Sequence, residues 1–385
     1  MIPIAVPDTS GNEAKYLQEC IETNFVSTVG PFVKKFEEQI CIESDAKYGV
    51  ATCSGTAGLH LALTSVGVTR DDLVIMPSFT FIASANAISQ CGAVPWLFDV
   101  SSESWTLDVV QLRTTLINET EVFEKNLFHK STGRRVAAIL PVYTLGHPAD
   151  MEQVKNLAEE FNLPIVADAA AGLGSRYRNQ NLGSLADLTV FSFNGNKTIT
   201  SGGGGMVVGN DKNLVEYARH LSTTARVGEE YHHDEIGFNY RLTNIQAAVG
   251  CAQIERLSEF VEKKRYIDAE YRKHFSSLGG IKFFPRTHWA TSACWFTGIT
   301  IEDKRLPSVS TLCKLLKSYG IQARTFWKPI HQQPAYNLAP KEQMLVSNSI
   351  SSRILTLPCS TQLTKEDQGV VADAVNLILR NSDAK

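Results

Sequence analysis

Short runs of consecutive apolar residues alternate with helical patterns between residues 46 and 210. Five of these runs have the length and the unbroken apolar character of strands that are covered on both faces of a sheet. They are residues 73–76, 94–98, 136–140, 164–167 and 188–191. Segments with apolar residues at helical spacing lie between them, for example residues 151–161. This alternation predicts a mostly parallel α/β sheet.

The pattern changes after residue 240. Residues 243–275 have the spacing of one or two long helices, shorter turn-rich segments follow, and residues 365–380 are again helical in pattern. These features predict a second, smaller α+β domain, and a chain of 385 residues is long enough for two domains. We expect a large domain over residues 1–255 and a small C-terminal domain over residues 256–385.

The composition excludes several classes of protein. Lys and Arg number 37 against 40 Asp and Glu, and this balance does not favour the basic surface that nucleic-acid binding requires. The first residues lack a basic flank before an apolar run, and the apolar runs are too short to span a membrane. The eight cysteines include no CxxC pair, which argues against a zinc or redox site. Most of them have apolar neighbours, so most should be buried thiols. We expect a soluble, cytoplasmic protein without a nucleic-acid or membrane partner.

Candidate chemistry follows from the places where the predicted strands end, because ligands of open α/β sheets bind at the carboxyl ends of the strands. Residues 53–60 combine Gly and hydroxyl residues with an apolar helix, which suits a phosphate, although Ser54 or Thr56 could simply cap that helix. Asp168 follows the run 164–167 and either faces the ligand or is an exposed strand end. Lys197 follows the run 188–191 and precedes four glycines, which allow close approach of the backbone.

Three known motifs are absent from this glycine-rich region. A P-loop, a GxGxxG fingerprint and a GxSxG elbow all fail on residue spacing. What remains is Asp168 and Lys197, each closing its own strand, downstream of a helix start that suits a phosphate. Pyridoxal phosphate needs a lysine amine for a Schiff base and an anion beside its pyridine nitrogen. Phe81 could stack on its ring, or could be an ordinary core aromatic residue.

Further distinctive segments lie along essentially the whole chain. They are residues 28–31 with 36–37, 54–57, 77–81, 168–170, 192–193 with Lys197, and 237–241. In these segments the chain resembles the DegT/DnrJ/EryC1/StrS family of sugar aminotransferases, which has the fold-type I, aspartate aminotransferase-like α/β fold. Within the family, three segments most resemble aminotransferases of bacterial legionaminic-acid and bacillosamine synthesis, with perosamine-type synthases next. These segments are residues 192–197, 222–235 and 327–331.

The resemblance implies roles for the matching positions. Lys197 would form the Schiff base with pyridoxal phosphate and transfer the proton, Asp168 would pair with the ring nitrogen, and Phe81 would stack on the ring. A homodimer with shared active sites is also implied. The implied phosphate contacts are Gly55, Thr56, Ser192 and, from the neighbouring subunit, Asn239. Many members have His or Gln three residues after the aspartate, where this chain has Ala171, so the contact to the cofactor's phenolic oxygen is missing or supplied differently.

The implied reaction moves an amino group from L-glutamate to C4 of a nucleotide-linked 4-keto-6-deoxy sugar. The sugar is expected to be a UDP-linked 2-acetamido-4-keto-2,6-dideoxyhexose of surface-glycan, legionaminic-acid or bacillosamine-type synthesis. Charge-assisted hydrogen bonds to it are predicted from a set of cationic residues. The set is Lys34, Arg226, His232, Arg241 and His331.

Other interpretations stay open. A GDP-perosamine-type synthase is the first alternative, and a non-catalytic sensor that binds pyridoxal phosphate is the second. Related dehydratases that deoxygenate sugars at C3 have histidine at the Schiff-base position, so Lys197 argues against them. Residues 232–235 could be taken as a metal cluster, but adjacent histidines seldom share one face and the cofactor needs no metal. We therefore expect no metal.

Overall fold

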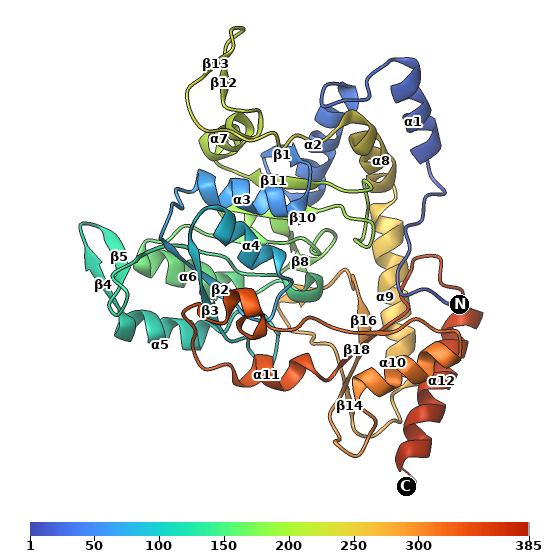
Figure 1. Cartoon of the computed structure of the whole chain (residues 1–385). Helices are drawn as coiled ribbons and strands as arrows, with labels where there is room; N and C mark the ends of the chain where they lie inside the picture. The colour runs from blue at the N-terminus through green and yellow to red at the C-terminus, as the bar shows by residue number, and fades with distance from the viewer. Residues whose placement is uncertain (384–385) are drawn as a thin grey trace.

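A twisted, mostly parallel sheet forms the centre of the computed structural model, which describes residues 1–383 (Figure 1). Its strands follow the order β1-β11-β10-β7, and isolated parallel bridges continue it through β6 and β2 to β3. Only β11 runs antiparallel to its neighbours in this series. The strands are β1 (Tyr48–Thr52), β11 (Gly205–Gly209), β10 (Leu188–Ser192), β7 (Val166–Asp168), β6 (Arg135–Ile139), β2 (Leu73–Pro77) and β3 (Val94–Phe98). The predicted mostly parallel α/β sheet is confirmed.

All five predicted strands are present, with one shift. The run predicted at residues 164–167 becomes β7, which begins at Val166. Pro164 has no N–H to donate to a neighbouring strand, although its carbonyl accepts a hydrogen bond from Ile139 N. The pattern did not single out β1 and β11, because glycines interrupt or end both runs.

Helices cover the sheet, and α3 packs on β10 and β11 while α2 packs on β1. The helix predicted at residues 151–161 is α6, and the predicted helical stretch 243–275 forms α8 and α9. A capping box of Thr243 and Gln246 begins α8. The helices are α1 (Glu13–Glu22), α2 (Pro31–Ser44), α3 (Gly55–Ser65), α4 (Ala83–Gln90), α5 (Val109–Glu119), α6 (Met151–Phe161), α7 (Lys212–Ser222), α8 (Asn244–Ile254), α9 (Leu257–His274), α10 (Val309–Ser318), α11 (Leu345–Ser351) and α12 (Lys365–Asp383).

A smaller antiparallel sheet, in the order β14-β16-β18-β17, is built from the C-terminal part of the chain. The first residues of the chain lie against this part, since Cys359 N donates to Ile4 O at 2.9 Å (Figure 1). The boundary predicted between residues 255 and 256 falls between α8 and α9, and the two-domain division remains a prediction. The strands are β14 (Ile281–Phe283), β16 (Thr297–Ile301), β18 (Ile354–Leu357) and β17 (Arg324–Thr325).

Several short strands lie outside the two main sheets or at their edges. One hairpin pairs with β6, a second projects from the molecule after α7 (Figure 1), and a three-stranded sheet has the order β15-β8-β9. They are β4 (Thr120–Phe123) with β5 (Asn126–His129), β12 (Arg226–Val227) with β13 (His232–His233), and β8 (Arg176–Tyr177), β9 (Gln180–Asn181) and β15 (Ala290–Thr291).

The expectation on membrane spans concerns the helices. Across residues 1–383, no helix is both long enough and apolar enough to cross a membrane.

All eight cysteines are free, but only Cys20, Cys251 and Cys359 are buried. The prediction that most cysteines are buried is therefore wrong. Cys53, for example, is exposed because it lies beyond the end of β1, beside a cavity.

Candidate active site

A cavity of about 400 Å³ lies at the carboxyl ends of β1, β7 and β10. The chain brings together here the predicted cofactor-site residues that were expected from a single subunit. They are Gly55, Thr56, Phe81, Asp168, Ser192 and Lys197. Within the described residues 1–383, three charged side chains line the cavity, and these are Asp168, Lys197 and Arg324. The first two were predicted and Arg324 was not.

Asp168 supplies a buried carboxylate at the end of β7, with only 5% of its surface exposed. Ser84 Oγ donates a hydrogen bond to Oδ2 at 2.7 Å, and the Ala170 N–H donates to Oδ1 at 3.0 Å. Burial raises the pKa of Asp168, whereas these hydrogen bonds and the charge of Lys197 lower it. No lysine or arginine of residues 1–383 forms a direct ion pair with it. The carboxylate is therefore fixed in place and can pair with a cationic group of a ligand.

Lys197 supplies the amine, from the loop between β10 and β11. Its Nζ lies 4.0 Å from the centre of the Trp295 ring, and the Trp295 indole N–H donates to Asn196 O at 2.5 Å. Burial lowers the pKa of Lys197 to about 8; the charge of Asp168 opposes this shift and that of Arg324 adds to it. An amine with this pKa is partly neutral near physiological pH, so it can act as a nucleophile and as a base.

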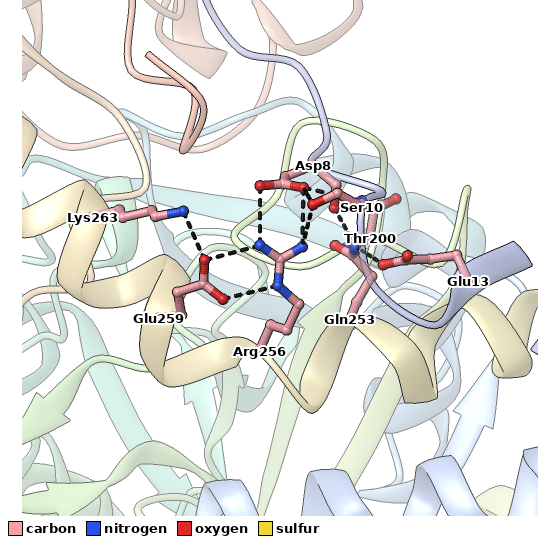
Figure 2. A network of polar contacts seen from close by, with 8 residues as sticks. All are labelled: Asp8, Ser10, Glu13, Thr200, Gln253, Arg256, Glu259 and Lys263. Carbon is pink, nitrogen blue, oxygen red and sulfur yellow. Dashed lines mark hydrogen bonds and ion pairs between the residues drawn. The ribbon is translucent and has the colours of Figure 1, made fainter. Parts of the chain in front are cut away.

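A network of polar contacts holds the loop that carries Lys197 (Figure 2). The Thr200 N–H donates to Gln253 Oε1 at 3.2 Å. Gln253 Nε2 in turn donates to Asp8 O and to Glu13 Oε1, both at 2.6 Å. Arg256, between α8 and α9, donates a hydrogen bond from Nη1 to Asp8 Oδ1 at 3.0 Å. The loop is thereby tied both to the N-terminal segment and to the end of α8.

The start of α3 forms the opposite end of the cavity. Ser54 caps this helix, since its Oγ accepts a hydrogen bond from Ala57 N at 3.0 Å. A Cβ atom on Gly55 would lie 2.8 Å from Ser192 Cβ, and one on Gly205 would lie 2.7 Å from Gly55 N. These glycines therefore let the helix start pack directly against the ends of β10 and β11. Backbone N–H groups at such a helix start bind anions well.

These features fit pyridoxal phosphate. The helix start and Ser192 suit its phosphate, Asp168 suits its protonated ring nitrogen, and Lys197 suits its aldehyde carbon. Phe81 has 55% of its surface exposed and lines the cavity, so it is not a core aromatic residue and can stack on a flat ring. The walls also contain the buried hydroxyl of Tyr143, which has no hydrogen-bond partner within residues 1–383.

The remaining predicted residues lie outside this cavity in the single chain. Arg226 and His232 are exposed on the β12–β13 hairpin, and Asn239 is exposed just after it. The Arg226 guanidinium packs 4.6 Å from the centre of the Tyr231 ring and donates to Glu230 O at 3.0 Å. Their roles toward substrate and phosphate stay predictions.

The other three predicted substrate contacts also face elsewhere. Lys34 Nζ lies 3.8 Å from Glu38 Oε1 on the exposed side of α2. Arg241 is exposed and bridges to Thr52 at the end of β1. His331 Nδ1 lies 2.7 Å from Ser78 Oγ, close to the loop that carries Phe81. None of these three residues lines the cavity, so their assignments also remain predictions.

The acidic residues of segment 232–235 have partners other than a metal. His220 Nε2 lies 2.7 Å from Asp234 Oδ1, and the Tyr217 hydroxyl donates to Glu235 Oε2 at 2.7 Å. Over the described chain, no three His, Cys, Asp or Glu side chains are grouped in a way that could hold a metal ion.

Several residues in or directly behind the cavity wall were missed by sequence reasoning. Ser84 orients Asp168 from the start of α4, while Trp295 and Arg324 come from the small sheet and its approach. None of these residues stands in a motif or at the end of a predicted strand of the large sheet. The place of Trp295 and Arg324 in the cavity becomes visible only when the small sheet packs over it, whereas Ser84 is identified by its hydrogen bond to Asp168.

Comparisons with known proteins agree with this geometry. Residues 7–376 match the model of the DegT/DnrJ/EryC1/StrS aminotransferase family. EpsN of Bacillus subtilis (strain 168), described as a pyridoxal phosphate-dependent aminotransferase, is 35% identical over 100% of this chain and 97% of its own length. GDP-perosamine synthase of Escherichia coli O157:H7 is 34% identical over 97% of this chain and 98% of its own. The crystal structure of a DegT DnrJ EryC1 StrS aminotransferase from Brucella abortus superposes with a TM-score of 0.87, at 26% identity, covering 96% of this chain and 95% of that one.

Proposed function

Because this chain belongs to the DegT/DnrJ/EryC1/StrS aminotransferase family of pyridoxal phosphate-dependent sugar transaminases, we propose that it aminates C4 of a nucleotide-linked 4-keto-6-deoxy sugar. The proposed amino donor is L-glutamate. The proposed acceptor is a UDP-linked 2-acetamido-4-keto-2,6-dideoxyhexose, an intermediate of legionaminic-acid or bacillosamine-type glycan synthesis. The observation that carries the proposal is the buried carboxylate of Asp168 in the same cavity as the partly neutral amine of Lys197.

The chemistry divides between the cofactor and the chain. Pyridoxal phosphate, when bound, supplies an aldehyde that accepts the donor's amine and a ring that takes up electrons. Lys197 Nζ removes the proton from the donor's α-carbon and, in the return half of the reaction, delivers a proton to C4 of the sugar. Asp168 holds a proton on the ring nitrogen, because a fixed opposite charge favours the charged form of that nitrogen. Trp295 covers the Lys197 amine and limits the access of water to it.

A second copy of the chain completes the site in this proposal. The sugar's diphosphate and base need cationic and polar contacts outside the cavity, and the exposed hairpin residues Arg226 and His232 can provide them to a neighbouring subunit. Asn239 has the same role toward the cofactor's phosphate. Lys34, Arg241 and His331 are proposed as further substrate contacts around the cavity.

A GDP-linked sugar is the second candidate acceptor. It is favoured by the 34% identity to a GDP-perosamine synthase over nearly the whole chain. The two candidates differ in the nucleotide and in the substituent at C2 of the sugar, and both use the same groups of Asp168 and Lys197.

A substrate panel tests the proposal. The holoenzyme is incubated with ¹⁵N-labelled L-glutamate and with UDP-, GDP- or dTDP-linked 4-keto-6-deoxy sugars, and products are identified by mass spectrometry. We expect labelled nitrogen in a 4-amino sugar, fastest with the UDP-linked 2-acetamido substrate. The Lys197→Ala variant serves as the control and should give no product. Absence of a labelled amino sugar from every substrate would reject the function, and a cofactor that glutamate does not convert would favour a non-catalytic sensor.

A further inference from the structure

One face of α9 carries three polar side chains that are buried. Lys264, Asp268 and Tyr271 follow one another at spacings of four and three residues, which places them in one row along the helix. Their exposed fractions are 4%, 4% and 2%. The helix lies beside the small sheet (Figure 1), and each of the three side chains forms a hydrogen bond with a residue at or next to the end of β16 or β18. This row therefore holds the ends of two strands in place.

The contacts of Asp268 and Tyr271 are explained by the packing of the small sheet. Asp268 Oδ1 accepts a hydrogen bond from Thr297 Oγ1 at 2.6 Å, and the Tyr271 hydroxyl donates to Pro358 O at 3.0 Å. None of these four residues lines the cavity that contains Lys197.

Lys264 differs from them, because it is a buried cation without an anionic partner. Within residues 1–383, no Asp or Glu forms an ion pair with it, whereas the neighbouring Lys263 pairs with Glu259. Its Nζ donates instead to two carbonyl groups, Trp295 O at 3.0 Å and Cys359 O at 3.1 Å. Burying an ammonium group costs free energy, and an apolar side chain could fill the same space without that cost. The charge is therefore explained by the two carbonyl groups that it holds.

Trp295, one of the two residues that Lys264 holds, lines the cavity. Its carbonyl belongs to the peptide bond with Phe296, so a hydrogen bond to this oxygen restricts the rotation of that planar unit. The centre of the Trp295 ring lies 4.0 Å from Lys197 Nζ, and its indole N–H donates to Asn196 O at 2.5 Å. The centre of the Phe296 ring lies 4.6 Å from the guanidinium carbon of Arg324. One peptide unit therefore carries both rings that contact the cations of the cavity.

We propose that Lys264 is a positioning residue of the active site, which fixes the Trp295–Phe296 peptide and through the Trp295 ring fixes the amine of Lys197. The effect of Lys264 on turnover rests on the proposed function, because it requires Lys197 to react with the cofactor. The position of the amine does not depend on that function and can be measured without the cofactor. A lysine that only held the small sheet together would affect stability and leave Lys197 unchanged.

Lys264→Met tests the inference, since methionine is also long and unbranched but cannot donate to either carbonyl. Lys197 in the cofactor-free protein is acetylated at a series of pH values, and its modification is read by peptide mass spectrometry. In the wild type the midpoint should lie near the pKa of about 8 to which burial lowers the amine. In Lys264→Met the ring no longer stays over the amine, so water reaches it and the midpoint should move up toward about 10.4. The lost contact with the ring face acts in the opposite direction, but it is weaker than burial.

Tyr271→Phe is the matched control, because it removes a hydrogen bond of the same helix face and leaves Trp295 O untouched. Both variants should lower the melting temperature, but only Lys264→Met should change the acetylation midpoint of Lys197. Lys264→Arg keeps the charge and the donor groups, so its midpoint should stay near that of the wild type. Lys264→Gln, which keeps an amide donor, should shift the midpoint less than Lys264→Met, and it replaces that variant if methionine prevents folding.

Turnover of the holoenzyme shows whether Lys264 acts through Trp295. Lys264→Met should lower turnover about 10- to 100-fold, the loss expected when a reacting group is misplaced by about 1 Å. Trp295→Leu removes the ring itself. Adding Lys264→Met to Trp295→Leu should therefore change turnover by less than about twofold and leave the acetylation midpoint where Trp295→Leu puts it.

Three outcomes overturn the assignment. An unchanged acetylation midpoint in the folded Lys264 variants would show that this lysine serves only the packing of the small sheet. A shift of the same size in Tyr271→Phe would show that any loosening of that sheet has this effect. Losses that multiply in the double variant would show that Lys264 acts by a route other than Trp295. A wild-type enzyme that transfers no nitrogen would instead reject the proposed function, and the acetylation comparison would still test the position of Lys197.

Discussion

The amine of Lys197 is subject to opposing electrostatic effects, and these set the pH at which it reacts. Burial and the charge of Arg324 lower its pKa to about 8, while the charge of Asp168 raises it. Only the neutral amine is a nucleophile, so acylation of Lys197 in the cofactor-free protein should rise with pH through about 8 and then level off. Exposed lysines should continue to gain reactivity toward about pH 10.4. Brief acetylation at a series of pH values, read for each lysine by peptide mass spectrometry, measures both curves.

Two variants test the causes of that shift. Arg324→Gln removes a neighbouring positive charge, so the midpoint for Lys197 should move up. Asp168→Asn removes a neighbouring negative charge, so the midpoint should move down. A midpoint near 10.4 in the wild type, or shifts of the opposite sign in the variants, would contradict this account of the site.

Asp168 gives a second prediction at the scale of single residues. Asp168→Asn keeps the size of the side chain but removes the charge that we propose pairs with the cofactor's ring nitrogen. Breaking a buried ion pair costs about 3–5 kcal/mol, which corresponds to about 10²- to 10⁴-fold in turnover. The Lys197–cofactor link should persist, and borohydride reduction followed by mass spectrometry of the Lys197 peptide would detect it.

Ser84→Ala is the matched control for Asp168→Asn. It removes the hydrogen bond at Oδ2 but leaves the carboxylate and its contact with Ala170 N. Its loss of turnover should be smaller than about 100-fold, in keeping with about 1–3 kcal/mol for one hydrogen bond to a charged group. Asp168→Asn with turnover near that of the wild type would remove Asp168 from the proposed chemistry.

The residues that sequence reasoning found share one physical property. Asp168 and Lys197 stand where strands of the large sheet end, and the order of strands and helices alone brings such positions to one edge. Arg324 and Trp295 belong to a different part of the chain, and their place in the cavity depends on how the small sheet packs on the large one. Packing of this kind leaves no periodic signal in the sequence, so neither residue could be predicted.

At the scale of elements, the predicted strands differ from the unpredicted ones in how continuous their apolar runs are. Central strands such as β2 and β6 are continuous apolar runs, because both of their faces are covered. β11 begins and ends in glycine, and Gly205 is needed because a side chain there would collide with the start of α3. The glycine that the close approach of α3 requires therefore shortens the apolar run of β11 at the end that faces α3.

Residues at the end of α8 and between α8 and α9 belong to the network that holds the Lys197 loop (Figure 2). The contribution of this network to the stability of the protein can be measured. Arg256 pairs with Asp8, whose side chain has 4% of its surface exposed. Arg256→Ala leaves this carboxylate buried without a cation and should lower the free energy of unfolding by about 3 kcal/mol. Urea denaturation of the cofactor-free protein measures the change. Lys263→Ala is the control, because its ion pair with Glu259 is 43% exposed at both ends and should contribute at most about 0.5 kcal/mol.

The pH dependence of the Arg256→Ala effect provides a check on its cause. Hydrogen bonds from Arg256 and Ser10 hold the pKa of Asp8 well below its ordinary value, although burial opposes them. A carboxyl whose pKa is lowered on folding stabilises the protein above its unfolded pKa of about 3.9, and this contribution is lost as the pH falls. The difference between the wild type and Arg256→Ala should therefore shrink below about pH 4. A difference that is constant from pH 7 to pH 3 would indicate a packing effect instead.

At the scale of the whole molecule, exposed apolar residues lie where we propose that a second copy binds. Phe25, Val26 and Val29 are exposed in the loop between α1 and α2, and Asn244 Nδ2 ties this loop to the start of α8 by donating to Phe25 O at 2.8 Å. Ile236 is exposed beside the β12–β13 hairpin. Figure 1 draws the hairpin and the α1–α2 region at the same end of the molecule. Apolar surfaces of this kind are typical of interfaces, which supports the proposed homodimer.

Complementation between two inactive subunits tests whether that dimer shares its active sites. Lys197→Ala removes the reacting amine, and Asn239→Asp places a negative charge where the proposal puts the cofactor's phosphate. Each homodimer should be inactive at limiting cofactor. If Asn239 serves the neighbouring subunit, a heterodimer of the two variants has one site with both substitutions and one site with neither. Co-expressed and differently tagged subunits, purified as the heterodimer, should then recover about half of the wild-type activity per dimer. If Asn239 serves its own subunit, both sites of the heterodimer carry one substitution and no activity returns, which would reject the shared site while leaving the dimer itself intact.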